Sequence, residues 1–184
     1  MVQKWPVLKV EPLGDFRIFQ IRREHKRSPR TGVEHDFFVL DCPGWVNVIA
    51  LTPDRQIVLV EQYRHGTDTV DLEIPGGVMD PHDASPIATG ERELREETGY
   101  AGRHARILAT VATNPAFMTN RCYTVLVEDC TRQHEVQFDH SEDIVTRIVP
   151  LRDIPQLVRE ERMPHSLVQV ALCRLMIDFP QWFK

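Results

Sequence analysis

The sequence predicts an α+β or α/β sandwich, in which a sheet packs against a small number of helices. Strand-like segments dominate the first half of the 184-residue chain, a helix with clear ends follows, and the C-terminal part is helical in pattern. Strands that alternate with few helices are typical of such layered folds. The length is sufficient for one domain with a substantial core.

The first half is predicted to form strands. Residues 16–24, FRIFQIRRE, alternate apolar and polar side chains as a half-buried strand does. EHDFFVLD at residues 34–41 follows an SPRTG turn and is expected to pair with that strand as a hairpin. The segments at residues 44–51 and 56–63 flank TPDR, in which Pro53 suits the second turn position.

A helix is predicted directly after residue 85. Ser85 is a good N-cap residue, Pro86 suits the first helical position, and Gly99 suits the residue just past the C-terminus. Three further strands and two helices are expected downstream, the strands at residues 105–112, 121–129 and 144–151 and the helices at residues 151–162 and 166–179.

Composition and charge exclude several classes of protein. The net charge of −5 argues against a nucleic-acid binder, which would show a basic face. The apolar runs are too short to span a bilayer, and the N-terminus has no signal-peptide pattern. The four cysteines show no C-x-x-C spacing, so we expect a reduced cytoplasmic protein whose cysteines fill the core.

The predicted helix gathers Glu93, Glu96 and Glu97 on one side, because residues three and four apart lie one turn apart. Like charges at this spacing repel each other. A hard divalent cation would offset the repulsion, and carboxylates are the ligands such ions prefer. The preceding Pro75–Gly77 is expected to form a tight loop whose carbonyl groups can complete a coordination shell. A solvated acidic face is the alternative.

The segment GG…RELREETGY resembles the Nudix hydrolase box, G-x5-E-x7-R-E-U-x-E-E-x-G-U with U apolar. The matching residues are Gly77, Arg92, Glu93, Leu94, Glu96, Glu97 and Gly99, with Tyr100 at the last apolar position. The resemblance is strongest from residue 58 to 100. It implies an α/β/α sandwich with a mixed sheet over residues 41–184, and an N-terminal antiparallel strand extension over residues 1–40.

The loop before the helix departs from the pattern. The interval from Gly77 to Arg92 is one residue longer, Asp83 replaces the usual Glu, and Ala84 is the extra residue. In the family this loop acid braces the loop against the box arginine, so an ion pair between Asp83 and Arg92 is expected. The insertion precedes the Ser85 cap, so the helical register of the glutamates is kept.

The resemblance implies metal-dependent hydrolysis of a nucleoside diphosphate linked to another group. Glu93 and Glu97 are the expected principal ligands of Mg²⁺, with Mn²⁺ as a substitute, and Glu96 and the Gly76 carbonyl contribute. Glu96, Glu97 and Arg92 are also expected to act in catalysis. A further acid is expected in the loop before residue 144, where Glu142 is the candidate metal ligand and general base, with Asp139 and Asp143 as substitutes.

Other residues resemble the branch that acts on ADP-ribose and nucleoside diphosphate sugars. Pro115 lies fifteen residues past Tyr100, and QYR and E-x-P-x-G segments precede the box. The implied substrate-binding residues are Arg64, Glu73, Pro115, Phe117 and Met118. Two roles are open for Arg64, which either binds a phosphate or is a surface residue at a strand end. Two are also open for Glu73, which either hydrogen-bonds the substrate or pairs with Arg64. Phe117 and Met118 line the ribose side or simply pack.

ADP-ribose is the favoured substrate, and GDP-mannose or another nucleoside diphosphate sugar is an alternative. Two other readings remain, a nucleoside triphosphate sanitising pyrophosphatase and a Nudix-fold sensor that binds a nucleotide without cutting it. The branch also implies a homodimer, with residues 1–40 as a region that can swap between subunits. No nucleic-acid or membrane partner is expected.

Overall fold

The computed structural model describes residues 1–138, 140 and 143–184. The chain divides into two compact units. Unit 1 comprises Met1–Gly44 and Ala112–Arg121, and unit 2 comprises Trp45–Val111 and Cys122–Lys184.

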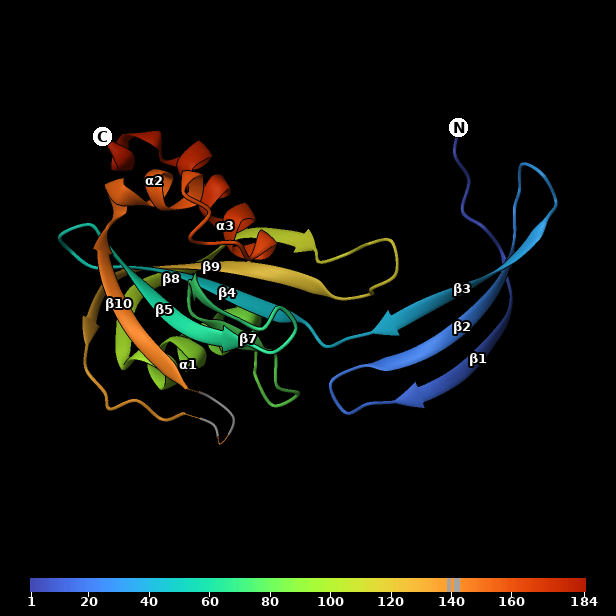
Figure 1. The fold of residues 1–184 in the computed structure, drawn as a ribbon, viewed down its shortest axis with the longest axis horizontal. Helices are drawn as coiled ribbons and strands as arrows, with labels where there is room; N and C mark the ends of the chain where they lie inside the picture. The colour runs from blue at the N-terminus through green and yellow to red at the C-terminus, as the bar shows by residue number, and fades with distance from the viewer. Residues whose placement is uncertain (139, 141–142) are drawn as a thin grey trace. The chain divides into compact units, whose positions relative to one another are not determined.

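Unit 1 contains a three-stranded antiparallel sheet in the order β1-β2-β3 (Figure 1). β1 spans Val7–Asp15, β2 Gln20–Arg27 and β3 Glu34–Asp41. The expected turn between β2 and β3 is present, because the Ser28 N–H donates to the Val33 carbonyl at 2.9 Å and Gly32 has a φ of 73°. Glycine takes this left-handed conformation without the strain that a side chain would bring.

The segment at residues 112–121 belongs to unit 1 because it bonds to the end of β3 and the residues after it. The Leu40 N–H donates to the Phe117 carbonyl at 2.8 Å, and the Thr119 N–H returns a bond to Leu40 at 3.1 Å. Asn120 donates its side-chain N–H to the Pro43 carbonyl at 2.9 Å. Unit 1 is therefore built from two separate stretches of chain.

The strand predicted at residues 16–24 was wrong in position, and β1 was missed. The chain turns at residues 16–19, where the Phe16 N–H donates to the Phe19 carbonyl at 2.9 Å. The Asp15 carboxylate accepts from the Arg17 N–H at 3.0 Å, and Arg17 has a φ of 68°. Apolar alternation therefore continues through a turn that a local side-chain hydrogen bond stabilises.

Unit 2 is organised around a seven-stranded mixed sheet, with the path β10-β5-β4-β9-β8; β6 pairs with β5, and β7 with β4. β4 and β9 are parallel, whereas β4–β5 and β5–β10 are antiparallel. The strands are β4 (Trp45–Leu51), β5 (Gln56–Arg64), β6 (Thr69–Glu73), β7 (Gly76–Val78), β8 (Tyr100–Ala112), β9 (Arg121–Arg132) and β10 (Ile144–Pro150). The short strands β6 and β7 were not predicted.

Helices cover both sides of this sheet, which confirms the predicted α/β sandwich (Figure 1). α1 (Pro86–Thr98) lies on one side, where Leu94 packs with Val46, Val48 and Val125. On the other side lie α2 (Ile154–Arg159) and α3 (Ser166–Asp178), preceded by the short helix η1 (Leu151–Asp153). Their apolar side chains join Ile49, Leu51 and Leu59 in the larger core cluster.

The ends of α1 are those predicted. The Ser85 hydroxyl accepts from the Ala88 N–H at 3.2 Å. Gly99 ends the helix with a φ of 74° and donates its N–H to the Arg95 carbonyl at 2.8 Å. Both caps satisfy backbone groups that a helix end leaves unpaired. They fix which residues of α1 face the sheet.

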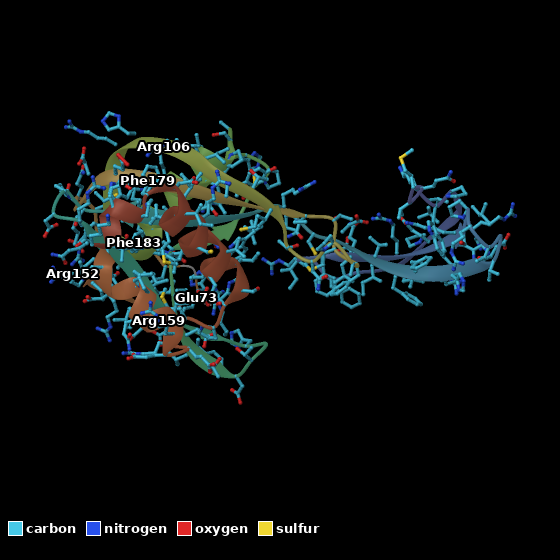
Figure 2. All side chains as sticks on the ribbon, turned by 90° about the horizontal axis from the view of Figure 1, so that it is seen from above. Glu73, Arg106, Arg152, Arg159, Phe179 and Phe183 are labelled. Carbon is cyan, nitrogen blue, oxygen red and sulfur yellow. The ribbon has the colours of Figure 1, made fainter. Side chains whose placement is uncertain are left out.

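The C-terminal segment η2 (Pro180–Phe183) is held by stacked rings and cations. Phe179 and Trp182 stack at 4.0 Å between ring centroids, and Arg55 lies 4.0 Å over the Trp182 ring. Arg106 lies 6.0 Å over the Phe179 ring. Figure 2 labels Arg106 and Phe179. Such contacts between cations and aromatic faces are attractive. In the part of the chain that the structure describes, no helix has the length and apolar character needed to cross a bilayer.

The prediction that the cysteines fill the core holds for two of them. Cys122 and Cys130 are buried, and burial raises the pKa of Cys122 to about 11 and that of Cys130 to about 12. Cys42 is half-buried. The prediction was wrong for Cys173, which is exposed on α3 because the helix buries its opposite side.

Candidate active site

Two adjacent glycines bring β4 and α1 into close contact. Gly76 and Gly77 form the short strand β7, which pairs with Asn47 and Val46 of β4. A Cβ atom built on Gly76 would lie 2.2 Å from the Val46 carbonyl oxygen, and one on Gly77 would lie 2.3 Å from the Glu93 carboxylate. Only glycine permits this backbone approach. The tight loop predicted at Pro75–Gly77 is instead mostly strand, because Gly76 and Gly77 belong to β7. This segment, called the glycine loop below, lies between β4 and the acidic helix.

Glu93 and Glu97 lie on the buried side of α1. Glu97 is 2% exposed and Glu93 is 8% exposed. The Gly76 N–H donates to Glu97 Oε2 at 3.0 Å, which ties the second glutamate to the glycine loop. Buried carboxylates are rare unless they are bonded or bind metal. The alternative of a solvated acidic face is therefore wrong for these two residues, although Glu96 remains partly exposed.

Arg92 bonds to three carboxylates. It donates to Asp83 through Nε at 3.2 Å and Nη2 at 3.0 Å, and it lies 2.9 Å from both Glu93 and Glu96. The hydrogen bonds from Arg92 lower the pKa of Asp83 to about 2, and the Asp83 carboxylate in turn raises the pKa of Arg92. The expected brace between Asp83 and Arg92 is confirmed, so the extra residue does not prevent it.

The donor atoms gathered here suit a hard cation. Glu93, Glu96, Glu97 and the Gly76 carbonyl offer oxygen only, which is the ligand type that Mg²⁺ and Mn²⁺ prefer. Among the residues the structure describes, no group of three or more His, Cys, Asp or Glu side chains forms a metal-binding arrangement. In the arrangement seen, Glu93 and Glu96 face Arg92, and Glu97 bonds to Gly76. The chemistry of the donors fits such an ion, and the side chains would have to turn before they could converge on one.

Arg64 and Glu73 form a two-bond ion pair in unit 2. Arg64 donates through Nε at 2.6 Å and Nη2 at 2.8 Å, and Glu73 is 2% exposed. The Glu73 carboxylate raises the pKa of Arg64, with a smaller contribution from the charge of Glu97. Of the two roles considered for Glu73, pairing with Arg64 is the one observed. The Nη1 side of the guanidinium makes none of these bonds.

The other candidates are placed differently. Pro115, Phe117 and Met118 belong to unit 1, where they lie in the segment that bonds to Leu40. Glu142 and its substitute Asp139 lie outside the described residues, and Asp143 is exposed. The roles assigned to these residues stay predictions.

Sequence reasoning overlooked a polar cavity beside Glu96. It has a volume of about 510 Å³, and the Gln137 N–H donates to the Glu96 carbonyl at 2.8 Å at its edge. The lining residues are polar or charged: Arg95, Glu96, Gln133, His134, Glu135 and Gln137. No pattern in residues 133–137 signalled that this segment returns to the acidic helix.

Comparison with known proteins supports one family. The Nudix domain model matches residues 44–168. The chain is 34% identical over 158 residues to the ADP-ribose pyrophosphatase of Mycobacterium tuberculosis, covering 85% of this chain and 76% of that protein. It is 28% identical over 172 residues to the methanol dehydrogenase activator of Bacillus methanolicus, covering 93% of this chain and 92% of that protein.

A solved structure shares the fold. The crystal structure of an ADP compounds hydrolase superposes with a TM-score of 0.87 at 21% identity, covering 98% of this chain and 97% of that one. The fold is thus that of a known hydrolase. The chain belongs to the Nudix family.

The two glycines are expected to differ in how they tolerate a methyl group. Gly76→Ala should lower the free energy of unfolding by about 1–3 kcal/mol or more, because the added Cβ meets a backbone oxygen that cannot move away. Gly77→Ala should cost about 1 kcal/mol or less, because the Glu93 side chain can turn, yet it should slow catalysis. Urea denaturation measures the stabilities, and equal losses for both variants would contradict this assignment.

The pair between Asp83 and Arg92 should contribute to stability in a defined pH range. Because the folded state lowers the pKa of Asp83 from 3.8 to about 2, the contribution is complete above 3.8 and is lost as the pH falls towards 2. Arg92→Gln should return the midpoint of the Asp83 carboxyl ¹³C signal towards 3.8. The control is Arg95→Gln, an exposed change on the same helix, which should leave the Asp83 midpoint near 2. An Asp83 midpoint that stays near 2 in Arg92→Gln would contradict the pairing.

Proposed function

We propose that this chain is a divalent-metal-dependent pyrophosphatase that hydrolyses ADP-ribose, with other nucleoside diphosphate sugars as weaker substrates. Mg²⁺ is the proposed metal and Mn²⁺ a substitute. The observation that carries the proposal is the buried side of α1, where Glu93 and Glu97 meet the glycine loop beside Glu96. Buried carboxylates are stabilised by compensating cations, and a bound divalent ion would supply such charge.

Each residue of this corner has a proposed role. Glu93 and Glu97 are the principal metal ligands, and Glu96 and the Gly76 carbonyl share the coordination. A bound divalent ion would neutralise the diphosphate charge and lower the pKa of a bound water. Arg92 can keep its two bonds to Asp83 while Glu93 and Glu96 turn away from it, so the loop stays braced.

The proposed reaction adds one water across the diphosphate. The water oxygen forms a bond to one phosphorus, the bond from that phosphorus to the bridging oxygen breaks, and the products are a nucleoside monophosphate and a sugar phosphate. The proton released by the water needs an acceptor. Glu142 remains the proposed general base and an additional metal ligand, on the sequence argument alone.

The substrate class is supported by the relative from Mycobacterium tuberculosis, whose name is ADP-ribose pyrophosphatase. Arg64 supports it physically. Its Nε and Nη2 bond Glu73, so the edge formed by its two terminal nitrogens is available to bind a phosphate without breaking the pair. Pro115, Phe117 and Met118 are retained as proposed substrate contacts.

The competing interpretations predict different behaviour in solution. A sanitising pyrophosphatase would prefer a nucleoside triphosphate such as dGTP. A sensor would bind nucleotide without turnover, and the retention of all three box glutamates argues against that role. The four cysteines are free thiols, which fits the reducing cytoplasm that we propose as the location.

The parent protein should hydrolyse ADP-ribose with Mg²⁺ and lose activity when the metal is chelated. Glu97→Gln should still bind substrate but lose on the order of 100-fold or more in turnover, because it removes a proposed ligand. Phosphate released by a coupled phosphatase measures the rate over a panel of ADP-ribose, GDP-mannose, UDP-glucose, a dinucleoside polyphosphate and dGTP.

Glu91→Gln is the matched control, because Glu91 lies on the exposed side of the same helix. It should leave the rate unchanged. Binding without hydrolysis by the parent would favour the sensor, and preference for dGTP would favour the sanitising enzyme. An undiminished rate in Glu97→Gln would refute the ligand assignment.

We further propose a homodimer, with unit 1 as the contact region. A three-stranded sheet needs a packed face to be stable, yet Val7, Val10, Leu13 and Phe38 of this sheet are each more than 40% exposed. A second copy of the chain would bury them. Whether residues 1–40 also swap between subunits stays part of this proposal.

Val10→Asp should convert the proposed dimer to a monomer, because a charge would enter the apolar contact. Val10 is 53% exposed, so the change should not unfold the chain. Light scattering after size exclusion measures the mass of each form. Lys9→Gln, a polar change at the neighbouring position, is the control and should stay dimeric, whereas a monomeric parent would contradict the proposal.

A further inference from the structure

Trp45 and Asn47 form a hydrogen-bonded pair at the start of β4. Residues two apart in a strand point to the same side, so the two side chains are neighbours. The Trp45 indole N–H donates to Asn47 Oδ1 at 2.7 Å. Asn47 is 2% exposed, and its Nδ2 has no partner among the described residues.

The pair contacts both Arg64, the proposed phosphate ligand, and the glycine loop that bonds Glu97. Arg64 lies over the Trp45 ring, with 5.8 Å between Cζ and the ring centroid. Asn47 is the register partner of Gly76, and a Cβ on Gly76 would lie 3.1 Å from both Asn47 Cα and Asn47 Oδ1. The Gly76 N–H in turn bonds Glu97. A continuous path of contacts therefore joins Arg64 to the glutamate corner.

Core packing does not account for Asn47. Ile49 and Leu51 follow on the same side of β4 and are both buried and apolar. An amide in that row leaves one donor buried and unpaired, which destabilises the fold relative to an apolar side chain of similar size. What the amide adds is its oxygen, which fixes the orientation of the indole. A fixed indole presents its face to the guanidinium, and this orders a long side chain that would otherwise sample many rotamers.

We propose that Trp45 and Asn47 are positioning residues, which hold Arg64 at a set place relative to the Gly76–Glu97 corner so that it meets the diphosphate. This rests on the proposed function, because it assigns Arg64 to substrate. Glu73 holds one edge of the guanidinium, and Arg64 Cζ lies over the Trp45 ring, so the remaining edge is left for the phosphate. The bond from Trp45 to Asn47 fixes the orientation of that ring.

Steady-state kinetics with ADP-ribose and Mg²⁺ tests the pair. Asn47→Val removes the acceptor and the unpaired donor together, and water can bond the N–H of the partly exposed Trp45, so the variant should melt no lower than the parent. It should raise KM about fivefold to tenfold, the effect of about one lost hydrogen bond, and change kcat less than about twofold. The reason is that a phosphate contact is made equally in the ground state and the transition state. Trp45→Phe keeps a ring over Arg64 and should raise KM less than Trp45→Leu does.

A structural role alone would give a different pattern. Ile49→Val, a loss of packing in the same row, should lower the melting temperature without changing KM. An unchanged KM in Asn47→Val would overturn the proposal. So would a KM effect in Trp45→Phe equal to that in Trp45→Leu, or a kcat loss that exceeds the change in KM.

A binding measurement separates this proposal from the proposed activity. With 5-fluorotryptophan incorporated, the ¹⁹F signal of Trp45 should shift on titration with Mg²⁺ and inorganic pyrophosphate. The Trp182 signal should not shift, because Trp182 lies against Arg55 at the other end of β4 and β5. In Asn47→Val the Trp45 shift should need about fivefold to tenfold more pyrophosphate. If the parent protein does not hydrolyse ADP-ribose, only the proposed activity is refuted. If the ¹⁹F signal of Trp45 does not shift when pyrophosphate is added, the positioning role is refuted.

Discussion

The absence of side chains at Gly76 and Gly77 is the constraint on which the site depends. Strand, loop and helix meet there at distances that a single methyl group would prevent. Gly90 extends the same principle along α1, since a Cβ there would lie 3.2 Å from both Val46 and Val125. The helix therefore lies close to the sheet along its inner side. This closeness buries Glu93 and Glu97 and brings backbone groups within reach of their carboxylates.

Burial of these carboxylates is unfavourable unless their negative charge is compensated. Neighbouring residues supply the compensation. Arg92 supplies one positive charge to Asp83, Glu93 and Glu96, and the Gly76 N–H supplies a neutral donor to Glu97. Arg95 lies 3.4 Å from Glu96 and adds a second positive charge beside these carboxylates. A divalent ion bound here, as proposed, would add the positive charge that an anionic diphosphate needs in order to approach these carboxylates. Arg64 adds a separate cation whose own partner, Glu73, is already buried against it.

Features set by a few neighbouring residues could be predicted from the sequence. The caps at Ser85 and Gly99 depend on one side chain and one backbone conformation, so the bounds of α1 followed from them. The pair between Asp83 and Arg92 followed in the same way, because the cap lies between the insertion and the helix. The apolar strands β4 and β5 were likewise located, with one end of each shifted by one residue.

Features that depend on distant partners were not predictable in this way. β1 pairs with β2 through a turn at residues 16–19 that the apolar alternation concealed. The side of α3 on which Cys173 lies depends on which face the sheet covers. The bond from Trp45 to Asn47 matters only because β7 lies next to Asn47 and Arg64 lies next to Trp45. No residue near position 45 in the sequence indicates either contact.

Unit 1 is built from two separate stretches of chain, and this limits how the protein can be shortened. Residues 112–121 are part of unit 1, and they bond to Leu40 and Pro43. A truncation that removes the first 44 residues would leave the Phe117 carbonyl, the Thr119 N–H and the Asn120 amide without these partners. The N-terminal strands are thus no detachable tail. A shortened chain that is meant to keep the catalytic unit would need a redesigned connection between β8 and β9 as well as a new start.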